Sequence, residues 1–225
     1  MKQLFLIFLL GACAVFQGQA QLSRTLSAFR ELDVTDKIRV RLLSGEEDKI
    51  VIEGEYAGQL ELIQTDDVLR LKMTTSAIMQ GHKVDVSLYA KNISSIIARK
   101  GAQISTDNHE LEVDSIYLSA NEGARIAIRV HTGSIEAWST AGGSITLEGE
   151  AEEQTVNCTF GGHYEAKDLL SDYAYIRTNA GGKCLVNVGK SVDAQTRAGG
   201  VIDIYGNPSE RKQKRLAGGK INFIQ

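Results

Sequence analysis

Two histidines are spaced so that they could share a metal ion in a repetitive fold. His109 and His131 each lie eight residues after the first glycine of a Gly-Ala pair, at Gly101 and Gly123. If successive repeats stack in this register, the two side chains fall on adjacent coils. A zinc site needs further Cys, Asp or Glu ligands at the same place, and no third ligand is obvious here. We therefore expect solvated turn histidines, no bound metal and no cofactor.

Polysaccharide lyase or hydrolase chemistry would need clustered carboxylates with a basic residue beside them. The outward acids Glu148, Glu165 and Asp203 fall at different repeat positions, so we expect no dense acidic triad on one face. The sequence therefore predicts no catalytic residues. A carbohydrate-active enzyme stays as an alternative, and acidic side chains converging in a groove would favour it.

Five residues are candidates for ligand binding. Trp138, the only tryptophan, falls at an outward position, where it could stack on sugar rings or pack under a neighbouring loop. Arg211, Lys212, Lys214 and Arg215 form the one dense charge cluster and could bind an anionic glycan or lipopolysaccharide. Charge on a terminal strand also prevents edge-to-edge aggregation, and we favour this second interpretation of the basic run.

Two cysteines, Cys158 and Cys184, remain beyond the N-terminal segment. They face inward on opposite arms of adjacent repeats, which places them farther apart than the ~5.5 Å Cα separation that a disulfide prefers. We favour two buried thiols, and the bridge is left open.

Residues 1–20 have the anatomy of a secretory signal, with a charged start, an apolar run over 4–16 and small residues before the expected cleavage between Ala20 and Gln21. A lipoprotein anchored through Cys13 is the less favoured alternative. Either way the chain is exported, to the periplasm, the outer-membrane surface or the extracellular space. Cleavage removes one of the 25 basic residues and leaves 24 against 28 acidic ones, a net charge of −4. Such a chain has no electrostatic footprint for nucleic acid, and no second apolar segment predicts a transmembrane helix.

The elements that position these residues are set by a repeat. Gly-Gly or Gly-Ala pairs recur seven times at a mean period of 19.5 residues, (218 − 101)/6, which is typical of a solenoid. The first residues of the pairs are the turn glycines Gly101, Gly123, Gly142, Gly161, Gly181, Gly199 and Gly218.

Apolar residues alternate with polar ones on both sides of each glycine pair, the period of a half-buried strand. Each repeat is thus a strand, a tight turn, a second strand and a looser turn. Looser turns such as 149–154 and 206–209 would absorb the variation in repeat length. The sequence predicts an all-β fold, a right-handed parallel two-sheet β-helix, with about seven ~19-residue repeats over residues 91–225.

Residues 21–90 lack the repeat and contain five alternating runs that indicate hairpin-linked strands. We expect this segment to be an N-terminal β-meander cap that covers the first open edge and continues into the solenoid. The runs are 38–42, 49–53, 60–63, 68–72 and 84–88.

The chain resembles the putative autotransporter adhesin, head GIN domain family, a domain of unknown function widespread in Bacteroidetes. The resemblance lies in Phe29–Val34, the turn at Gly45, the run 65–71, the run 84–86 and the turn repeats, and it covers roughly residues 29 to 225. Here Gly-Gly replaces the family's usual Ser-Gly-Ala/Ser triplet, so the chain is a variant. The resemblance implies a two-sheet β-helix, a solenoid similar to pectin lyases, without known catalytic residues, and an adhesive role.

The sequence as a whole indicates a non-enzymatic exported module of the cell envelope that binds a surface glycan or another envelope component. A structural envelope protein that self-associates into homo-oligomers is a further alternative.

Overall fold

The computed structural model describes residues 22–224. The expected signal, Cys13 and the cleavage site between Ala20 and Gln21 lie outside these residues. Within them, no helix has the length and apolar character that crossing a membrane requires.

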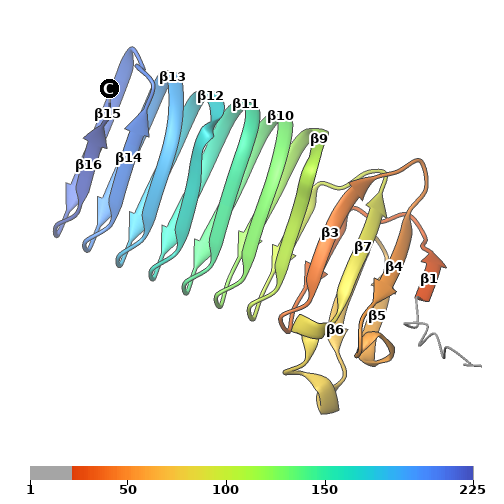
Figure 1. Cartoon of the computed structure of the whole chain (residues 1–225). Helices are drawn as coiled ribbons and strands as arrows, with labels where there is room; N and C mark the ends of the chain where they lie inside the picture. The colour runs from red at the N-terminus through yellow and green to blue at the C-terminus, as the bar shows by residue number, and fades with distance from the viewer. Residues whose placement is uncertain (1–21, 225) are drawn as a thin grey trace, which may run out of the picture.

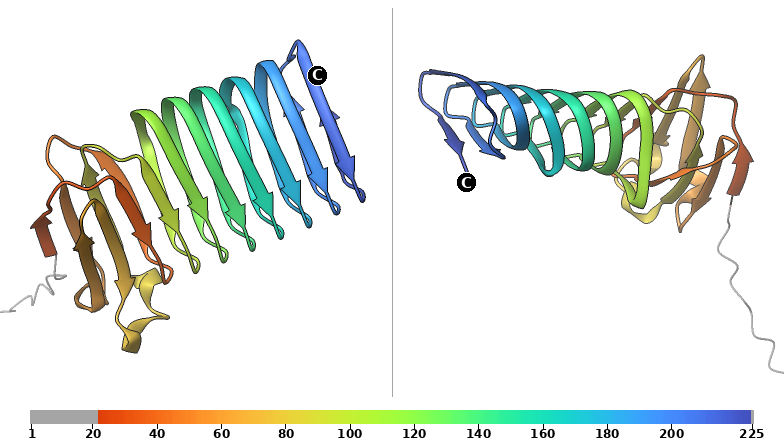
Figure 2. Two further views of the ribbon diagram at one scale, coloured as in Figure 1. Left: turned by 180° about the vertical axis from the view of Figure 1, so that it is seen from behind. Right: turned by 90° about the horizontal axis from the view of Figure 1, so that it is seen from above.

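The chain forms an all-β solenoid, a β-helix of about seven turns (Figure 1). Each long strand runs from one tight turn to the next and bends midway, so that it completes one coil, as the views in Figure 2 show. Successive coils pair in parallel. The solenoid strands are β8 (Ser95–Ala98), β9 (Gln103–Ala120), β10 (Arg125–Thr140), β11 (Ser144–Thr159), β12 (His163–Asn179), β13 (Lys183–Arg197), β14 (Val201–Tyr205), β15 (Glu210–Leu216) and β16 (Lys220–Phe223).

The core consists of inward rows that run from coil to coil. Because side chains alternate across a strand, every second residue on either side of a tight turn faces inward. One such row stacks Ile126, Ile145, Tyr164, Cys184 and Ile202, all fully or almost fully buried. The inward stacking predicted from the sequence is therefore present.

The two residues of each glycine pair are needed for different reasons. At the third tight turn Ala141 and Gly142 both adopt positive φ, 48° and 74°, and a Cβ on Gly142 would meet no atom within 4 Å. Gly143 is limited by space instead, because a Cβ there would lie 2.1 Å from the carbonyl oxygen of Ala120 on the preceding coil. The first glycine thus serves the turn conformation, and the second allows the coils to approach closely.

The coil length varies at a place that the sequence did not indicate. Residues 149–154 were expected to form a looser turn, but they lie within the continuous strand β11. The ladders shift register instead at β-bulges in β9 and β12. Residues 106–109 of β9 lie opposite Ile128 alone, and residues 166–167 of β12 lie opposite Leu147 alone. These bulges accommodate the extra residues. The other expected turn, 206–209, is a loop between β14 and β15.

The N-terminal segment contains strands where the sequence indicated them, but their pairing differs from a series of hairpins. Only β5 and β6 form a hairpin, whereas β7 lies between β3 and β4, and β2 lies between β6 and β8. Both β3 and β8 pair in parallel with β9, so the ladder runs from this segment into the solenoid. The elements are β1 (Leu22–Thr25), β2 (Glu31–Val34), β3 (Arg39–Ser44), β4 (Lys49–Glu53), β5 (Leu60–Thr65), β6 (Val68–Met73), β7 (Asp85–Ala90) and the short 3₁₀ helices Ala57–Gln59, Thr75–Ala77 and Gly81–Lys83.

Candidate functional site

One outward surface brings Trp138 into line with polar and charged residues. We call it the pre-turn face, the outward side of the strand halves that precede the tight turns. Direct strand pairing stacks five of its residues in a straight line across five strands, β10 to β13 and β15. At ~4.8 Å per strand, this line spans about 19 Å. We call it the axial row, and its members are Trp138, Asn157, Arg177, Gln195 and Lys214.

Aromatic side chains lie at and beside the axial row. Trp138 is 41 % exposed, and its indole Nε1–H donates a hydrogen bond to Glu136 Oε1 at 2.8 Å, which orients the ring. Tyr175 is 42 % exposed and lies two residues from Arg177 on the same face of β12. Exposed aromatic rings of this kind offer flat apolar surfaces next to polar groups.

A hollow of about 310 Å³ opens on the C-terminal half of the pre-turn face. Three exposed cations border it, Arg177, Arg197 and Lys214, and none of them forms an ion pair with any side chain that the structure describes. No carboxylate lines the hollow. Its other lining residues are Asn157, Thr159, Thr178, Asn179, Gln195, Thr196 and Leu216.

The predicted basic cluster is divided by the fold. Lys214 lies in the axial row with Trp138, whereas Arg215 follows the inward row and is exposed on the terminal strand β15. Arg211 stacks over the Phe223 ring at 4.5 Å and is held by Asn207. Lys212 is tied to Asp193 at 2.9 Å.

The Lys212–Asp193 pair fastens β15 to β13. Burial opposes ionisation of Asp193, but hydrogen bonds from Lys212 and Gln195 outweigh it and lower the pKa of this carboxyl below its ordinary value. The bond from Gln195 Nε2 measures 3.1 Å. Two of the four predicted basic residues therefore hold the end of the solenoid together, and Lys214 and Arg215 stay available for a ligand.

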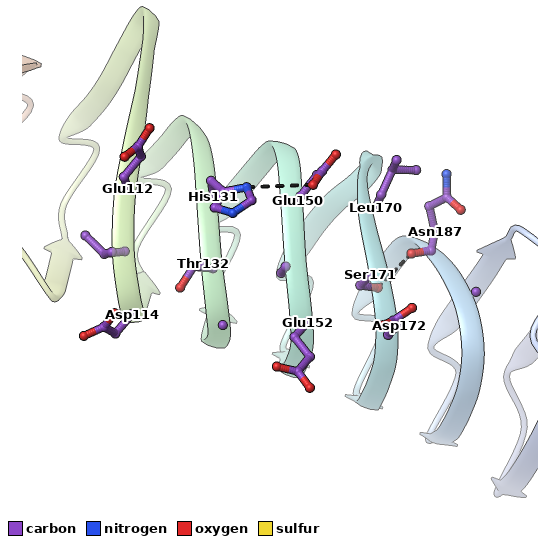
Figure 3. A pocket seen from close by; sticks show the side chains of 14 residues that line it. Glu112, Asp114, His131, Thr132, Glu150, Glu152, Leu170, Ser171, Asp172 and Asn187 are labelled. Carbon is purple, nitrogen blue, oxygen red and sulfur yellow. Dashed lines mark hydrogen bonds and ion pairs between the residues drawn. The ribbon is translucent and has the colours of Figure 1, made fainter.

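A second, larger groove lies midway along the coils, where the strands bend. Its volume is about 910 Å³, and two rows of side chains line it (Figure 3). One row carries Glu112, His131, Glu150, Leu170 and Asn187. The other carries Asp114, Glu152 and Asp172 around the gap left by Gly133. Five carboxylates share this groove, and the outward acids considered in the sequence, Glu148, Glu165 and Asp203, are not among them.

The groove's titratable groups are paired only in part. His131 Nδ1 lies 3.8 Å from Glu150 Oε2, and Lys190 binds Asp172 at 2.7 Å, a hydrogen bond that raises the pKa of Lys190. His131 stacks on Glu112 of the preceding coil and not on His109, because the extra residues of β9, within 106–109, shift the register. Among residues 22–224, no three His, Cys, Asp or Glu side chains lie close enough together to hold a metal ion.

The groove was missed because repeat positions were counted forward from each turn. The bulges lie between the preceding tight turn and the groove. Counting forward from that turn therefore gives different position numbers to residues that are neighbours on adjacent strands. Counted back from the following turn glycine, Glu112, His131 and Glu150 all lie eleven residues before it. The same count places Asp114, Gly133, Glu152 and Asp172 together at nine residues before it. Backward counting was therefore the signal that could have found this groove.

A buried polar chain connects the core to the floor of the groove. Tyr164 donates its hydroxyl to Gln154 Oε1 at 3.0 Å, Gln154 Nε2 donates to Ser171 Oγ at 2.6 Å, and Ser171 donates to the carbonyl of Asn187 at 2.8 Å. Burial raises the pKa of Tyr164 well above its usual range. Each of these four polar groups has a hydrogen-bond partner within the chain, so the network supports the floor of the groove without a buried, unpaired polar atom.

The two cysteines are free and fully buried, as favoured from the sequence, but they are neighbours in the core and not far apart as their positions in the repeats suggested. Burial, followed by the neighbouring Cys158, raises the pKa of the Cys184 thiol well above its ordinary value. Both thiols are therefore small core residues and contribute to neither surface.

A family model described as putative auto-transporter adhesin, head GIN domain, matches residues 28–208. The chain belongs to this family. The match covers most of the solenoid and the N-terminal segment. It includes the groove at the strand bends and the pre-turn face as far as β13, whereas β15 with Lys214 lies beyond it. The resemblance noted in the sequence is thereby confirmed. No curated protein matched the chain.

Crystal structures of bacterial proteins share the fold. One, described as a putative adhesin from Bacteroides fragilis, is 18 % identical over 92 % of this chain and 98 % of its own, with a TM-score of 0.84. A putative adhesin from Parabacteroides distasonis is 14 % identical, covers 91 % and 96 %, and has a TM-score of 0.73. A protein from the same species described as a putative lipid binding protein is 12 % identical, covers 93 % and 98 %, and has a TM-score of 0.67. At these identities the likeness concerns the fold alone.

Proposed function

We propose that this adhesin-like protein is an exported, non-enzymatic module of the cell envelope that binds a surface polymer through its pre-turn face. The observation that carries the proposal is the axial row, in which an exposed tryptophan leads a straight line of hydrogen-bonding and charged side chains. The family's description as an adhesin supports the same role. The apolar run in residues 4–16 supports export.

The mechanism is the addition of weak contacts on a rigid ladder. Each coil places one aromatic, amide or cationic side chain of the axial row ~4.8 Å from the last, and a polymer with repeating units can contact several coils at once. Linking weak contacts in this way raises the overall affinity far above that of one contact. The ladder is rigid because its rows are fixed by continuous backbone pairing, so little ordering entropy is lost on binding.

The test is a glycan array with the wild-type protein beside Trp138→Ala. The matched control is Phe160→Ala, which removes another exposed ring, 67 % exposed, from a tight turn outside the pre-turn face. We expect Trp138→Ala to weaken the affinity for the glycan about fivefold, because ~1 kcal/mol of stacking on the indole ring is lost. Phe160→Ala should leave the affinity unchanged. If the wild-type protein binds no glycan on the array, the proposal is wrong.

A carbohydrate-active enzyme is the second candidate, because acidic side chains do converge in a groove. In this candidate Glu150 and Glu152 would supply the carboxylates that acid–base chemistry on sugars requires. The assay is release of reducing ends from a panel of polysaccharides. Activity that Glu150→Gln and Glu152→Gln both abolish, and that Trp138→Ala leaves intact, would favour this candidate over adhesion.

A further inference from the structure

Two of the three unpaired cations of the pre-turn face, Arg177 and Lys214, lie in line with Trp138, and Arg197 lies beside that line. Their charge distinguishes among polymers. We propose that this face binds an acidic polysaccharide, whose sugars carry carboxylate or sulfate groups, along the axial row. The inference rests on the proposed function, because it names the class of polymer that the same face would bind.

The charge on this part of the face is locally positive, although the whole chain has a net charge of −3. Arg177, Arg197 and Lys214 border the hollow without an ion pair to any described side chain. Of the nearby carboxylates, Asp193 is paired with Lys212 and also feels the positive charge of Arg177. Glu136 accepts a hydrogen bond from Trp138 and keeps its negative charge, but it lies two strands away from Arg177, so the three cations still outnumber it. An arginine guanidinium matches the planar geometry of a carboxylate or sulfate with two parallel hydrogen bonds.

The three cations are spaced along the solenoid as a polymer would meet them. Arg177 lies on β12, Arg197 on β13 and Lys214 on β15, so three successive coils each contribute one positive charge. Neighbouring strands are ~4.8 Å apart, and the first and last of these cations are therefore about 10 Å apart along the axis. A ligand with a single anionic group would leave two of these cations without a partner, whereas a repeating anionic chain would pair with all three.

The remaining groups of the hollow favour a sugar over a phosphate polymer. Asn157, Asn179 and Gln195 each present an amide, which both donates and accepts hydrogen bonds. Sugar hydroxyls also donate and accept, so they can satisfy both halves of an amide. A phosphodiester backbone only accepts, and it would leave the amide oxygens unpaired.

An aromatic ring lies close enough to the cations to contact the same sugar chain. Tyr175 precedes Arg177 by two residues on one face of β12, a distance of about 6.6 Å along the strand. A pyranose ring resting on Tyr175 would therefore bring its charged substituent within reach of the Arg177 guanidinium. Trp138 offers a second ring at the far end of the axial row.

The experiment is calorimetric titration of the protein with polygalacturonate and heparin oligosaccharides, beside neutral galactan oligosaccharides of the same length. Oligothymidylate and phosphatidylglycerol vesicles are included as anionic probes without acidic sugars. We expect the acidic oligosaccharides to bind about tenfold more tightly than the neutral ones. This preference should fall between about 50 mM and about 300 mM salt, because exposed charges are screened.

Variants test whether the named cations carry the preference. We expect Arg177→Gln/Lys214→Gln to lose about tenfold in affinity for the acidic oligosaccharides. Arg177→Lys keeps the charge and should lose less. The matched control is Arg125→Gln, an exposed cation at the start of β10 on the opposite arm, which should bind as the wild type does. Unchanged melting temperatures would show that the variants are folded.

The outcomes separate the two proposals. Equal affinity for neutral and acidic oligosaccharides, still lost in Trp138→Ala, would overturn this inference and leave the proposed function standing. Binding to oligothymidylate or to vesicles without binding to acidic oligosaccharides would also overturn it. Binding to no polysaccharide at all would end both proposals.

Discussion

The different roles of the paired glycines can be tested at the fourth tight turn, with Gly161→Ala beside Gly162→Ala. A Cβ on Gly161 would meet no atom within 4 Å, so only the positive φ of 73° opposes it. A Cβ on Gly162 would lie 2.0 Å from the carbonyl oxygen of Ser139, far inside ordinary contact. One substitution therefore strains a torsion, and the other forces two coils apart.

The magnitudes follow from the surroundings of each glycine. An alanine in the left-handed region costs about 1 kcal/mol, and Ala141 and Ala180 already adopt such conformations in neighbouring turns. At Gly162 the overlap cannot be relieved locally, because Ser139 Oγ donates to Gly143 O at 2.6 Å and accepts from His163 N at 3.0 Å. Overpacking of ~1–3 kcal/mol, together with two hydrogen bonds of ~1 kcal/mol each, gives about 3–5 kcal/mol.

The assay is reversible denaturation followed by circular dichroism. For a chain of this size we expect the melting temperature to fall by about 3 °C for Gly161→Ala and by about 10 °C or more for Gly162→Ala. Ala124→Gly is the reciprocal variant, because Ala124 occupies the second position of its pair and is fully buried. Similar losses for the two glycine variants would refute the distinction between conformation and close approach.

Three further predictions concern the interior and the terminal strand. Tyr164→Phe leaves Gln154 Oε1 without its donor and should lower the free energy of unfolding by about 1–3 kcal/mol in urea denaturation; an unchanged midpoint would mean that the buried network adds nothing. The lowered pKa of Asp193 stabilises the fold above the unfolded value of ~3.9 and is lost as pH falls through the lower folded value. Wild type and Lys212→Gln should therefore differ in melting temperature at pH 6 and converge at about pH 2; a constant difference would contradict this. Because burial raises its pKa, the Cys184 thiol should react with a thiol reagent only after unfolding, and rapid labelling of native protein would show that the core is open.

The inward rows were predictable because the turns are marked in the sequence. Glycine pairs fix the register on both sides of each turn, and side chains alternate strictly from there, so Ile126, Ile145 and Ile202 fall into one buried row. Tyr164 and Cys184 complete this row, although tyrosine is fully buried less often than the aliphatic residues. Counting from the turn was enough to place both.

The groove and the N-terminal pairing were not predictable in the same way. The extra residues of the first bulge lie in β9, at 106–109, while Ala127 and Arg129 on β10 alternate regularly. Every residue of β9 after the bulge is shifted relative to β10, which separates His131 from His109. In the N-terminal segment the alternation identifies strands but not their neighbours. The insertion of β7 between β3 and β4 depends on contacts between residues more than thirty positions apart.

The side-chain contacts of the basic run, residues 211–215, could not be predicted from the sequence either. Arg211 and Lys212 are partnered by Phe223 and Asp193, which precede or follow them by more than ten residues. Lys214 and Arg215, two and three residues further on, have no such partner among the described side chains. The basic run therefore divides into two residues that make contacts within the solenoid and two whose charges are free within the described part of the chain.

The bulges have a consequence for how this molecule could grow or shrink. Each bulge accommodates the surplus residues of its own coil. An insertion or deletion at a bulge therefore changes the circumference of that coil and leaves the register of the strand halves before the tight turns unchanged. Whole coils could then be duplicated, and each duplication would lengthen the axial row by one ~4.8 Å step. The length of the ligand-binding row and the circumference of a coil can thus change independently of each other.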